Sequence, residues 1–381
     1  MKPKIRFKGF EGEWKAEELS HICSVNRGVR VTRNDLHNNG VYPVYQNTDY
    51  PMGYYTKFNV ESNNPFVIVG GSAGLIGFCH TNFWAADDCV FFGDNPIINK
   101  SFLYNNLIFH KTEIKRNVRG ASVPRLDRET LRKLPVSIPS LPEQQAIASY
   151  FTTLDSQISA STSRLTSLKQ MKAASLQAMF PQEGETVPKI RFKGFEGEWK
   201  KVKFSELYER SSIKNDLSFG TDKIISVANM YFIKNSRQVD DDYLRSYNIM
   251  RLGDIAFEGN KSKNFAHGRL VENTIGDGIV SHVFIVMKPI SKNYDLNFWK
   301  YYINNENIMG NILVRSTKSS TMMTDLVVDD FLKESILVPS YEEQIEIGKI
   351  LTSLDRQISL QSQRLEKLKQ IKSACLDKMF V

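Results

Sequence analysis

The feature that most constrains the fold of this chain is a long segment that occurs twice. Residues Pro139–Phe180 and Pro339–Phe380 align without a gap at a constant offset of 200 (355 − 155, from the two Leu-Asp pairs). Apolar residues recur there in steps of three and four, at Leu154, Ile158, Leu165, Leu168, Leu176, Met179, Leu354, Ile358, Leu365, Leu368, Leu376 and Met379. This spacing predicts two long helices, each with a narrow apolar stripe. At a rise of about 1.5 Å per residue, each would be roughly 57 Å long. Neither stripe can bury itself, so we expect the two helices to pair antiparallel as a coiled-coil spacer.

Polar residues interrupt this stripe. In a heptad register, Lys172 and Lys372 fall at positions shared with the apolar residues, and so do Ser161 and Ser175. Polar residues inside a coiled-coil stripe cost stability but fix the register of the pairing. The alternative is that the stripe shifts by one residue near Met171 and Ile371, where the helical and heptad periods drift apart.

Composition narrows the class of protein. The chain has 381 residues, long enough for two domains, and a formal net charge of +8, which suits either an anionic partner or ordinary solubility. Cys23, Cys79, Cys89 and Cys375 form no CxxC pair, and the six histidines show no metal-ligand spacing. We therefore expect no metal site and a reducing compartment. With no signal peptide and no apolar run long enough to span a bilayer, the expected location is the cytoplasm.

A second repeat divides the chain into two halves. The segment Pro3–Lys15, PKIRFKGFEGEWK, returns unchanged at Pro188–Lys200, at an offset of 185 (188 − 3). The second variable body is therefore longer by 15 residues (200 − 185) than the first. We expect Trp14 and Trp199 to anchor each entry segment against its body. The predicted organisation is a first domain at 1–140, a spacer helix at 141–181, a linker and second domain at 182–340, and a C-terminal spacer helix at 341–381.

The two bodies are predicted to be α+β domains. Short apolar runs separated by Gly, Asn and Asp are typical of strands, and helical segments are few. The expected strands are 65–71, 75–78 and 89–92 in the first body and 223–227, 254–257 and 280–287 in the second. The expected helices are 102–109 and 296–304. A pseudo-two-fold repeat of two such domains, separated by the paired helices, is the expected fold.

Basic and amide residues gather in the turns of both bodies. Arginine and lysine suit phosphates, while arginine and asparagine can make bidentate bonds to base edges. The candidate DNA-contacting residues are Arg27, Arg30, Arg33, Asn34, Arg116, Arg119, Arg125, Lys261, Lys263, Asn264, His267, Arg269, Arg315 and Lys318. For each of these residues alone, a solvated loop charge is the simpler interpretation; as clusters on two tandem basic domains they favour DNA.

Catalytic motifs are incomplete. Asn63-Asn-Pro-Phe66 lacks the middle proline of the Asn-Pro-Pro-Phe motif that binds the target amine in amino-methyltransferases, and no cofactor loop precedes it. Gly70–Gly74 matches neither a dinucleotide loop nor a P-loop, so a tight turn is the better interpretation. Glu113-Ile-Lys115 lacks the upstream carboxylate of a nuclease motif. We expect no active site in this chain.

Residues of the repeated helix carry a family resemblance. Leu141-Pro-Glu-Gln-Gln-Ala-Ile-Ala with Leu154-Asp-Ser-Gln-Ile158, repeated as Glu343-Gln-Ile-Glu-Ile-Gly with Leu354-Asp-Arg-Gln-Ile358, resembles the helix of DNA specificity subunits from type I restriction-modification systems. The Gly-Phe-Glu-Gly-Glu-Trp entry, the 66–77 stretch and Arg251-Leu-Gly-Asp-Ile-Ala-Phe257 are similar to that family as well. The resemblance covers the whole chain in the family's order.

This resemblance implies a non-catalytic role. In the family, each domain reads one half of a bipartite, asymmetric DNA target, and the paired helices set the unread gap and dock two methyltransferase subunits. Those subunits carry S-adenosylmethionine, and restriction subunits that use ATP and Mg²⁺ join them, so no cofactor is expected on this chain. The alternatives are a specificity subunit of a related system without a translocase, a DNA adenine methyltransferase in its own right, and a coiled-coil scaffold.

Overall fold

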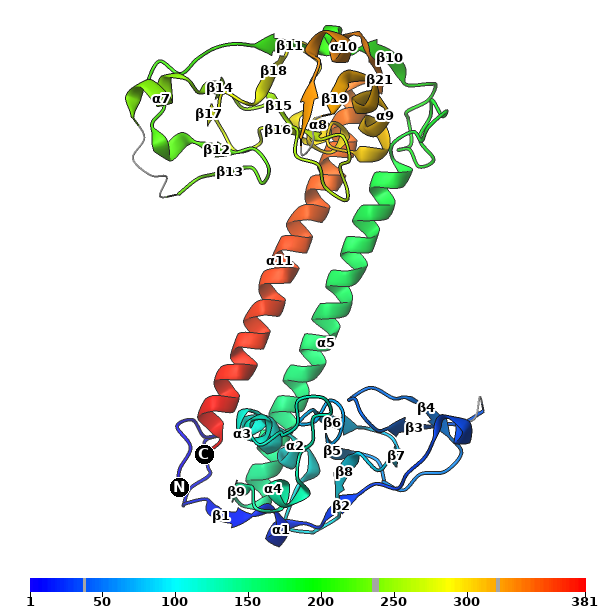
Figure 1. The fold of residues 1–381 in the computed structure, drawn as a ribbon, viewed down its shortest axis with the longest axis vertical. Coiled ribbons are helices and arrows are strands. Elements are labelled where there is room, and N and C mark those ends of the chain that lie inside the picture. Colours follow the sequence, from blue (N-terminus) through cyan, green and yellow to red (C-terminus); the bar gives the residue numbers. More distant parts are fainter. Residues whose placement is uncertain (37–38, 235–239, 320–322) are drawn as a thin grey trace. The chain divides into compact units, whose positions relative to one another are not determined.

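The computed structural model describes residues 1–36, 39–234, 240–319 and 323–381. The chain divides into two compact units, both of mixed helix and sheet (Figure 1). Unit 1 comprises residues 1–163 and 362–381, and unit 2 comprises residues 164–361. Each unit therefore contains one variable body and a part of both repeated segments.

The two repeated segments form the long helices α5 (Leu141–Ala178) and α11 (Tyr341–Met379). In unit 1 the first part of α5 packs on the last part of α11, where the Tyr150 Oη lies 3.4 Å from the Cys375 Sγ. In unit 2 the last part of α5 shares a core with the first part of α11, through Met179 and Leu351. The start of each helix thus lies against the end of the other, as antiparallel pairing requires.

Polar residues of the helix stripe make ion pairs between the helices. In unit 1, Lys372 Nζ donates to Asp155 Oδ1 at 2.5 Å. In unit 2, Lys172 Nζ donates to Asp355 Oδ1 at the same distance, 2.5 Å, and the Tyr301 hydroxyl donates to Asp355 Oδ2, also at 2.5 Å. Met171 and Ile371 are exposed, so the stripe does not shift onto them. The structure therefore favours register-fixing lysines over a drifting stripe.

Burial follows the predicted stripe unevenly. Leu154, Leu168, Met179, Leu354, Leu365 and Met379 are buried, whereas Ile158, Leu165, Ile358 and Leu368 are half-buried. Ser161 is buried as well, although it is polar. In a pair of helices, each apolar stripe is covered only by the partner helix, so the residues at its margins remain half-buried.

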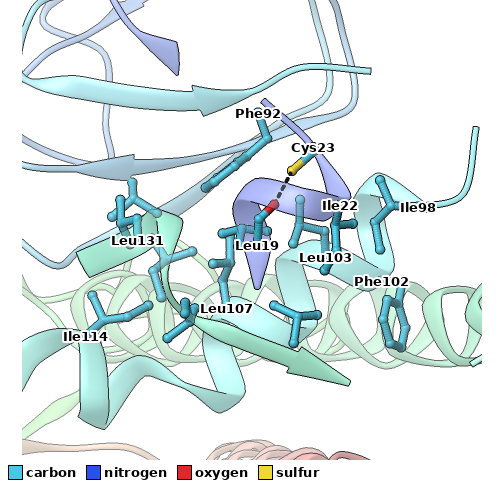
Figure 2. Packing of buried hydrophobic residues seen from close by; sticks show 14 of the residues in the cluster. Leu19, Ile22, Cys23, Phe92, Ile98, Phe102, Leu103, Leu107, Ile114 and Leu131 are labelled. Carbon is cyan, nitrogen blue, oxygen red and sulfur yellow. Dashed lines mark hydrogen bonds between the residues drawn. The ribbon is translucent and has the colours of Figure 1, made fainter. Parts of the chain in front are cut away.

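Unit 1 is built on a four-stranded antiparallel sheet. Its order is β2 (Val25–Arg27), β8 (Cys89–Phe92), β5 (Asn64–Ile68) and β6 (Ile76–Cys79). A smaller sheet has the order β4 (Gly53–Tyr55), β3 (Tyr42–Tyr45) and β7 (Trp84–Ala85). The helical segments are α1 (Leu19–Ile22), the 3₁₀ turn η1 (Arg33–Asp35), α2 (Lys100–Phe109), α3 (Lys111–Arg116) and α4 (Arg128–Arg132). Figure 2 shows their apolar side chains meeting in one core, with Phe92 of the sheet facing Leu19 and Leu103.

Unit 2 repeats this topology with longer connections. Its main sheet has the order β11 (Tyr208–Ser211), β18 (Ile285–Pro289), β15 (Ile255–Glu258) and β16 (Arg269–Glu272). Three two-stranded pairs accompany it: β12 (Ile225–Ser226) with β13 (Tyr231–Phe232), β14 (Asn248–Met250) with β17 (Gly278–Val280), and β19 (Thr317–Ser319) with β20 (Thr324–Leu326). The helical segments are α6 (Phe204–Leu207), η2 (Thr221–Lys223), α7 (Asp241–Arg245), α8 (Leu296–Tyr302), α9 (Glu306–Ser316) and α10 (Val328–Lys333).

Two strand predictions in unit 2 were wrong. Residues 280–287 form parts of β17 and β18 rather than one strand, because the chain turns between them with Phe284 N donating to Ser281 O at 3.0 Å. Residues 223–227 contain only the two-residue strand β12, preceded by the 3₁₀ turn η2. In both cases an apolar run predicted one strand where the chain bends, since apolar content alone does not register a turn.

Each body starts and ends in a pair of antiparallel strands. In unit 1, β1 (Lys15–Glu18) pairs with β9 (Pro135–Ile138), with Lys15 opposite Ile138. In unit 2, β10 (Lys200–Lys203) pairs with β21 (Ser335–Val338), with Lys200 opposite Val338. The two chain segments that connect a body to the rest of its unit therefore lie side by side. Among the residues that the structure describes, no helix is long and apolar enough to cross a membrane.

Candidate nucleic-acid interface

A buried arginine–glutamate pair fixes each entry segment to a long helix. Arg6 donates from Nε and Nη2 to both carboxylate oxygens of Glu143, each at 2.7 Å. Arg191 does the same to Glu343, at 2.7 and 2.8 Å. The side chains of both glutamates are only 1% exposed. The hydrogen bonds of its glutamate raise the pKa of each guanidinium, so both arginines stay charged.

The glutamine that follows each glutamate fixes the body. Gln144 Oε1 accepts from Asn99 N at 2.9 Å, and its Nε2 donates to Ile97 O and Pro139 O. Gln344 makes the corresponding bonds to Asp295 N and to Asn293 O and Pro339 O. At the start of each long helix, the glutamate therefore binds the entry segment, and the glutamine that follows it binds the body.

The predicted tryptophan anchors are buried in aromatic clusters. Trp14 lies 6.0 Å from Phe102 and 6.3 Å from Phe380, and Trp199 lies 6.1 Å from Phe298 and 6.5 Å from Phe180, between ring centroids. We call the entry segments, the paired strands β1–β9 and β10–β21 and the long helices the frame. The Arg–Glu pairs, the Gln bonds and the tryptophan clusters of the frame recur in both units, whereas the surfaces that the two sheets present differ.

In unit 1 a turn at Asp87–Asp88 collects polar side chains from separate strands. Arg27 Nε donates to Asp87 O at 2.7 Å, and Arg125 Nη1 donates to Asp88 Oδ1 at 3.1 Å. Asn47 Nδ2 donates to Asp88 Oδ2 at 3.3 Å. The structure therefore brings the predicted residues Arg27 and Arg125 to one turn, together with an amide that the prediction did not include.

The glycine loop between β5 and β6 borders this turn. Gly71 has a positive φ of 78°, and its N donates to Pro124 O at 3.2 Å. Ser72 N donates to Asn47 O at 3.1 Å. Arg119 and Arg125 exchange backbone hydrogen bonds of 2.8 and 2.7 Å, which forms a hairpin beside the loop. The loop is a tight turn between strands, as predicted, and its backbone is hydrogen-bonded to the segments that carry Asn47 and Pro124.

The other predicted residues of unit 1 are exposed and lie elsewhere. Arg30, Arg33 and Asn34 follow β2 in and before η1, and Arg116 ends α3. Their contact with DNA stays a prediction. Gln46 and Asn47 are not among the predicted residues, but both donate to the aspartates of the turn at Asp87–Asp88, and amide side chains are of the kind that can read base edges.

In unit 2 the hairpin between β15 and β16 carries most of the predicted residues. Lys261, Lys263 and Asn264 are exposed, and His267 and Arg269 are half-buried. Lys318 is exposed on β19, and β20 meets the hairpin where Thr324 N donates to Gly259 O at 2.8 Å. A groove of about 580 Å³ opens beside the hairpin, with Asn264, Asn304 and Asn307 among its lining residues.

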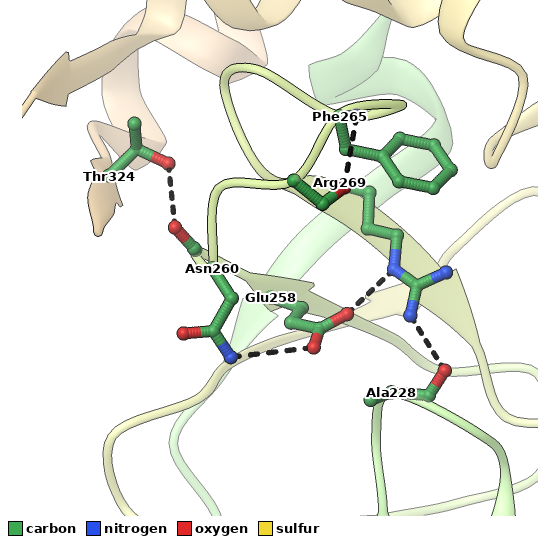
Figure 3. Close-up of polar contacts among 8 residues, drawn as sticks. Ala228, Glu258, Asn260, Phe265, Arg269 and Thr324 are labelled. Atoms are coloured by element: carbon green, nitrogen blue, oxygen red, sulfur yellow. Dashed lines mark hydrogen bonds and ion pairs between the residues drawn. The ribbon is translucent and has the colours of Figure 1, made fainter. Parts of the chain in front are cut away.

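Two predicted arginines in unit 2 are held by glutamates. Arg269 Nε lies 2.6 Å from Glu258 Oε2, and its guanidinium lies 5.0 Å from the centre of the Phe265 ring (Figure 3). Arg315 makes a two-bonded pair with Glu334, at 2.9 and 2.7 Å, which lowers the pKa of that glutamate. In both arginines, Nε and Nη2 already donate to acceptors within the protein.

The incomplete catalytic motifs have structural positions. Asn64 and Phe66 are buried in β5, where Asn64 Nδ2 donates to Phe92 O at 2.9 Å. Glu113 lies on α3 and pairs with His110 at 3.0 Å. Within the described residues, no group of His, Cys, Asp and Glu is arranged to hold a metal ion. The chain thus consists of a duplicated frame with two unlike polar surfaces, one in each unit.

Comparison with known proteins identifies the family. A family model described as the type I restriction modification DNA specificity domain matches residues 11–170 and again residues 196–370. The type I restriction enzyme MjaVIII specificity subunit of Methanocaldococcus jannaschii is 21% identical over 401 residues, which cover 96% of this chain and 91% of that protein. The crystal structure of the S subunit of a type I restriction-modification system from M. genitalium covers 100% of this chain with 17% identity and a TM-score of 0.66.

The chain belongs to the type I restriction-modification DNA specificity family. Its role is to recognise a DNA target, and it is not the catalytic subunit. The matches favour neither a methyltransferase acting alone nor a related system without a translocase. The fold of two α+β recognition domains with long paired helices, expected from the repeats, is confirmed by the solved relative.

Proposed function

We propose that each unit reads one half of a bipartite, asymmetric DNA target. The observation that carries this proposal is the repetition of the frame beneath two unlike surfaces. The buried pairs Arg6–Glu143 and Arg191–Glu343 match in geometry, whereas the sheets end in a seven-residue glycine loop (69–75) in unit 1 and a ten-residue cationic loop (259–268) in unit 2. Identical surfaces would read a symmetric sequence, and unlike surfaces support two different half-sites.

We further propose that α5 and α11 set the unread gap between the half-sites. Both helices contribute to both units, and the ion pairs of Lys172 and Lys372 fix their register. The repeated frame would offer two like faces, which suits the docking of two methyltransferase subunits. In this assignment the cofactors S-adenosylmethionine, ATP and Mg²⁺ belong to methyltransferase and restriction subunits. The complex then works in the cytoplasm, where its DNA is.

The test is co-expression of this chain with the methyltransferase subunit of the same system, followed by mapping of methylated adenines across the host DNA. A split sequence motif that is methylated only when both chains are present is the expected result. Methylation of the same sites by the partner alone would remove the recognition role. Methylation by this chain alone would reveal an active site in it.

The gap can be tested separately with matched insertions. Seven residues added between Ser163 and Arg164 of α5 and between Gln361 and Ser362 of α11 preserve the heptad stripe and lengthen each helix by about 10 Å. At about 3.4 Å per base pair, the gap should widen by about three base pairs with both half-sites unchanged. The control is the same insertion at Gly184, which lies in the linker after α5 and should leave the gap as it was.

A further inference from the structure

The hairpin between β15 and β16 has a tip that is ordered by its own backbone. Ser262 N donates to Phe265 O at 3.0 Å, and Phe265 N donates back to Ser262 O at 3.2 Å. This reciprocal pair of bonds makes Lys263 and Asn264 the two central residues of a hairpin turn. Both side chains are exposed. A cation and an amide therefore project from a fixed turn rather than from a loose loop.

The root of the same hairpin is locked by a shielded ion pair. Glu258 lies on β15 and Arg269 opposite it on β16, and their side chains are 10% and 21% exposed. Besides its 2.6 Å bond to Arg269 Nε, the Glu258 carboxylate accepts from Asn260 Nδ2 at 3.5 Å (Figure 3). Arg269 Nη2 donates to Ala228 O at 2.6 Å. The guanidinium thus connects the hairpin root to the segment after β12.

Three further contacts support the path of the loop. The Arg269 guanidinium lies against the Phe265 ring, so one side chain holds both the root and the end of the tip turn. Gly259 O accepts from both the N and the Oγ1 of Thr324, at 2.8 and 3.2 Å. Gly268 has a φ of +75°, and a Cβ there would meet Glu258 O at 2.6 Å. The return of the chain into β16 therefore requires glycine.

A shielded ion pair contributes little net stability compared with apolar residues of the same size, because desolvation offsets the attraction between the charges. Its contribution here is geometric, since it fixes where the tip lies. Asparagine in such a position can bond bidentately to adenine, and lysine can bond to guanine or to a phosphate. Base reading requires side chains held in place by a second layer of contacts, which is the role of Glu258 and Arg269.

We propose that this hairpin reads one half of the DNA target, with Lys263 and Asn264 contacting DNA and Glu258 as a positioning residue that acts through Arg269. The proposal rests on the function proposed above and adds to it the element and residues of one half-site.

The first experiment maps methylated adenines for Asn264→Ala and Lys263→Ala, each co-expressed with the methyltransferase subunit. Asn264→Ala should make one base position of a single half-site degenerate, with discrimination there reduced about tenfold to a hundredfold. Lys263→Ala should either relax a position in that same half-site or weaken binding to all sequences and lower the salt dependence of DNA binding. The other half-site and the gap should not change.

The second experiment tests positioning with Glu258→Gln and Glu258→Asp. Glu258→Gln removes the charge that holds Arg269 and should relax specificity in the half-site that Asn264 affects. Glu258→Asp keeps a carboxylate and should retain specificity in that half-site. The matched control is Glu209→Gln, which releases Lys288 from an equally close pair in the same unit, at 2.6 Å, and should leave both half-sites intact. If Glu258→Gln does not accumulate as folded protein, the two exposed tip variants decide the question.

The outcomes separate this inference from the function on which it rests. If the unaltered chain directs methylation of a split motif and the tip variants leave both half-sites and the affinity unchanged, the hairpin is not the reader. If Glu209→Gln relaxes specificity as much as Glu258→Gln does, the positioning role is overturned. If the unaltered chain directs no split motif, the proposed function itself fails.

Discussion

The two units differ in a consistent way: the polar contacts of their frame repeat, and the polar contacts at the ends of their sheets do not. The Arg–Glu pairs and the Lys–Asp pairs of the frame recur in both units with nearly equal distances. The Gln bonds recur between corresponding atoms, at 2.9–3.0 Å in unit 1 and 3.3–3.5 Å in unit 2. At the ends of the sheets, unit 1 uses an aspartate turn to hold Arg125, and unit 2 uses Glu258 to hold Arg269. The buried Arg–Glu pairs tolerate little change in geometry, because a buried charge without its partner lowers the stability of the folded state.

The exposed surfaces are constrained differently. Both arginines at the sheet ends bind carboxylates, but from different strands and at different exposures, 62% for Arg125 and 21% for Arg269. What the two solutions share is an anchored cation beside a hairpin. The comparison teaches that each unit keeps an anchored cation at the end of its sheet, although the residues that anchor it differ. Substitutions in the frame and at the ends of the sheets can test this.

The largest expected effect is at the repeated Arg–Glu pair. Arg191→Met would leave the Glu343 carboxylate buried without its partner and should reduce the free energy of unfolding by about 3–5 kcal/mol. Arg6→Met should destabilise unit 1 in the same way that Arg191→Met destabilises unit 2. Chemical unfolding with hydrogen–deuterium exchange would assign each loss to its unit. The exposed pair Lys189–Glu185, at 4.0 Å, is the control, and Lys189→Met should change stability by less than about 0.5 kcal/mol. Unequal losses at the two arginines would break the equivalence of the frames.

A pH-dependent effect is expected in unit 2. Burial raises the pKa of Asp254 to about 6, so the folded state holds this proton more tightly than the unfolded chain, whose aspartate has a pKa of about 3.9. The stability from this group is complete below about pH 4 and is lost as the pH rises through 6, by about 2–3 kcal/mol. Asp254→Asn should flatten this part of the stability profile measured by urea unfolding between pH 4 and 7.

Asp216 gives a control of opposite sign. The Ser218 hydrogen bonds lower its pKa, so its contribution is present at neutral pH and is lost as the pH falls. Asp216→Asn should therefore leave the slope between pH 5 and 7 unchanged. A profile for Asp254→Asn that keeps the original slope would show that another group titrates there.

The smallest effect is expected at the Lys–Asp pairs between the helices. Lys172→Asp places two carboxylates together and should destabilise unit 2 by about 1 kcal/mol, since the pair is partly exposed to water. The double change Lys172→Asp with Asp355→Lys should recover part of this loss. Thermal unfolding of the single and double variants measures the coupling. If the single and the double variant were equally stable, the register of the two helices would depend on apolar contacts alone.

The sequence predicted the frame more completely than the surfaces. The helices followed from a periodic stripe, and the tryptophan anchors followed from an identical repeat, so both were visible in local sequence. β8 was predicted to the residue at 89–92, because this four-residue apolar run is too short for a helix and is bounded by turns on both sides. The bend that separates β17 from β18 was missed, since Ser281-His282-Val283-Phe284 resembles the strands on either side.

The clamps at the sheet ends could not be predicted. Arg269 and Glu258 are separated by ten residues, and Arg125 and Asp88 by 36, so their pairing depends on strand order, which the sequence did not reveal. Arg269 and Arg315 were chosen as cations for DNA by residue type, and the structure shows both engaged with glutamates. Basic residues in a turn indicate an anionic partner, but the sequence does not show whether that partner is a carboxylate of the same chain or a phosphate of DNA.

The paired strands at the base of each body have a consequence for inheritance. Because β1 lies against β9 and β10 lies against β21, a body enters and leaves its unit at one place. A replacement of any length can be inserted between those strands without moving the frame, and the second body already carries the additional 15 residues (200 − 185). The entry segment before each body is identical, so either body follows the same residues of the frame. A lineage could thus acquire a new half of its DNA target in a single exchange.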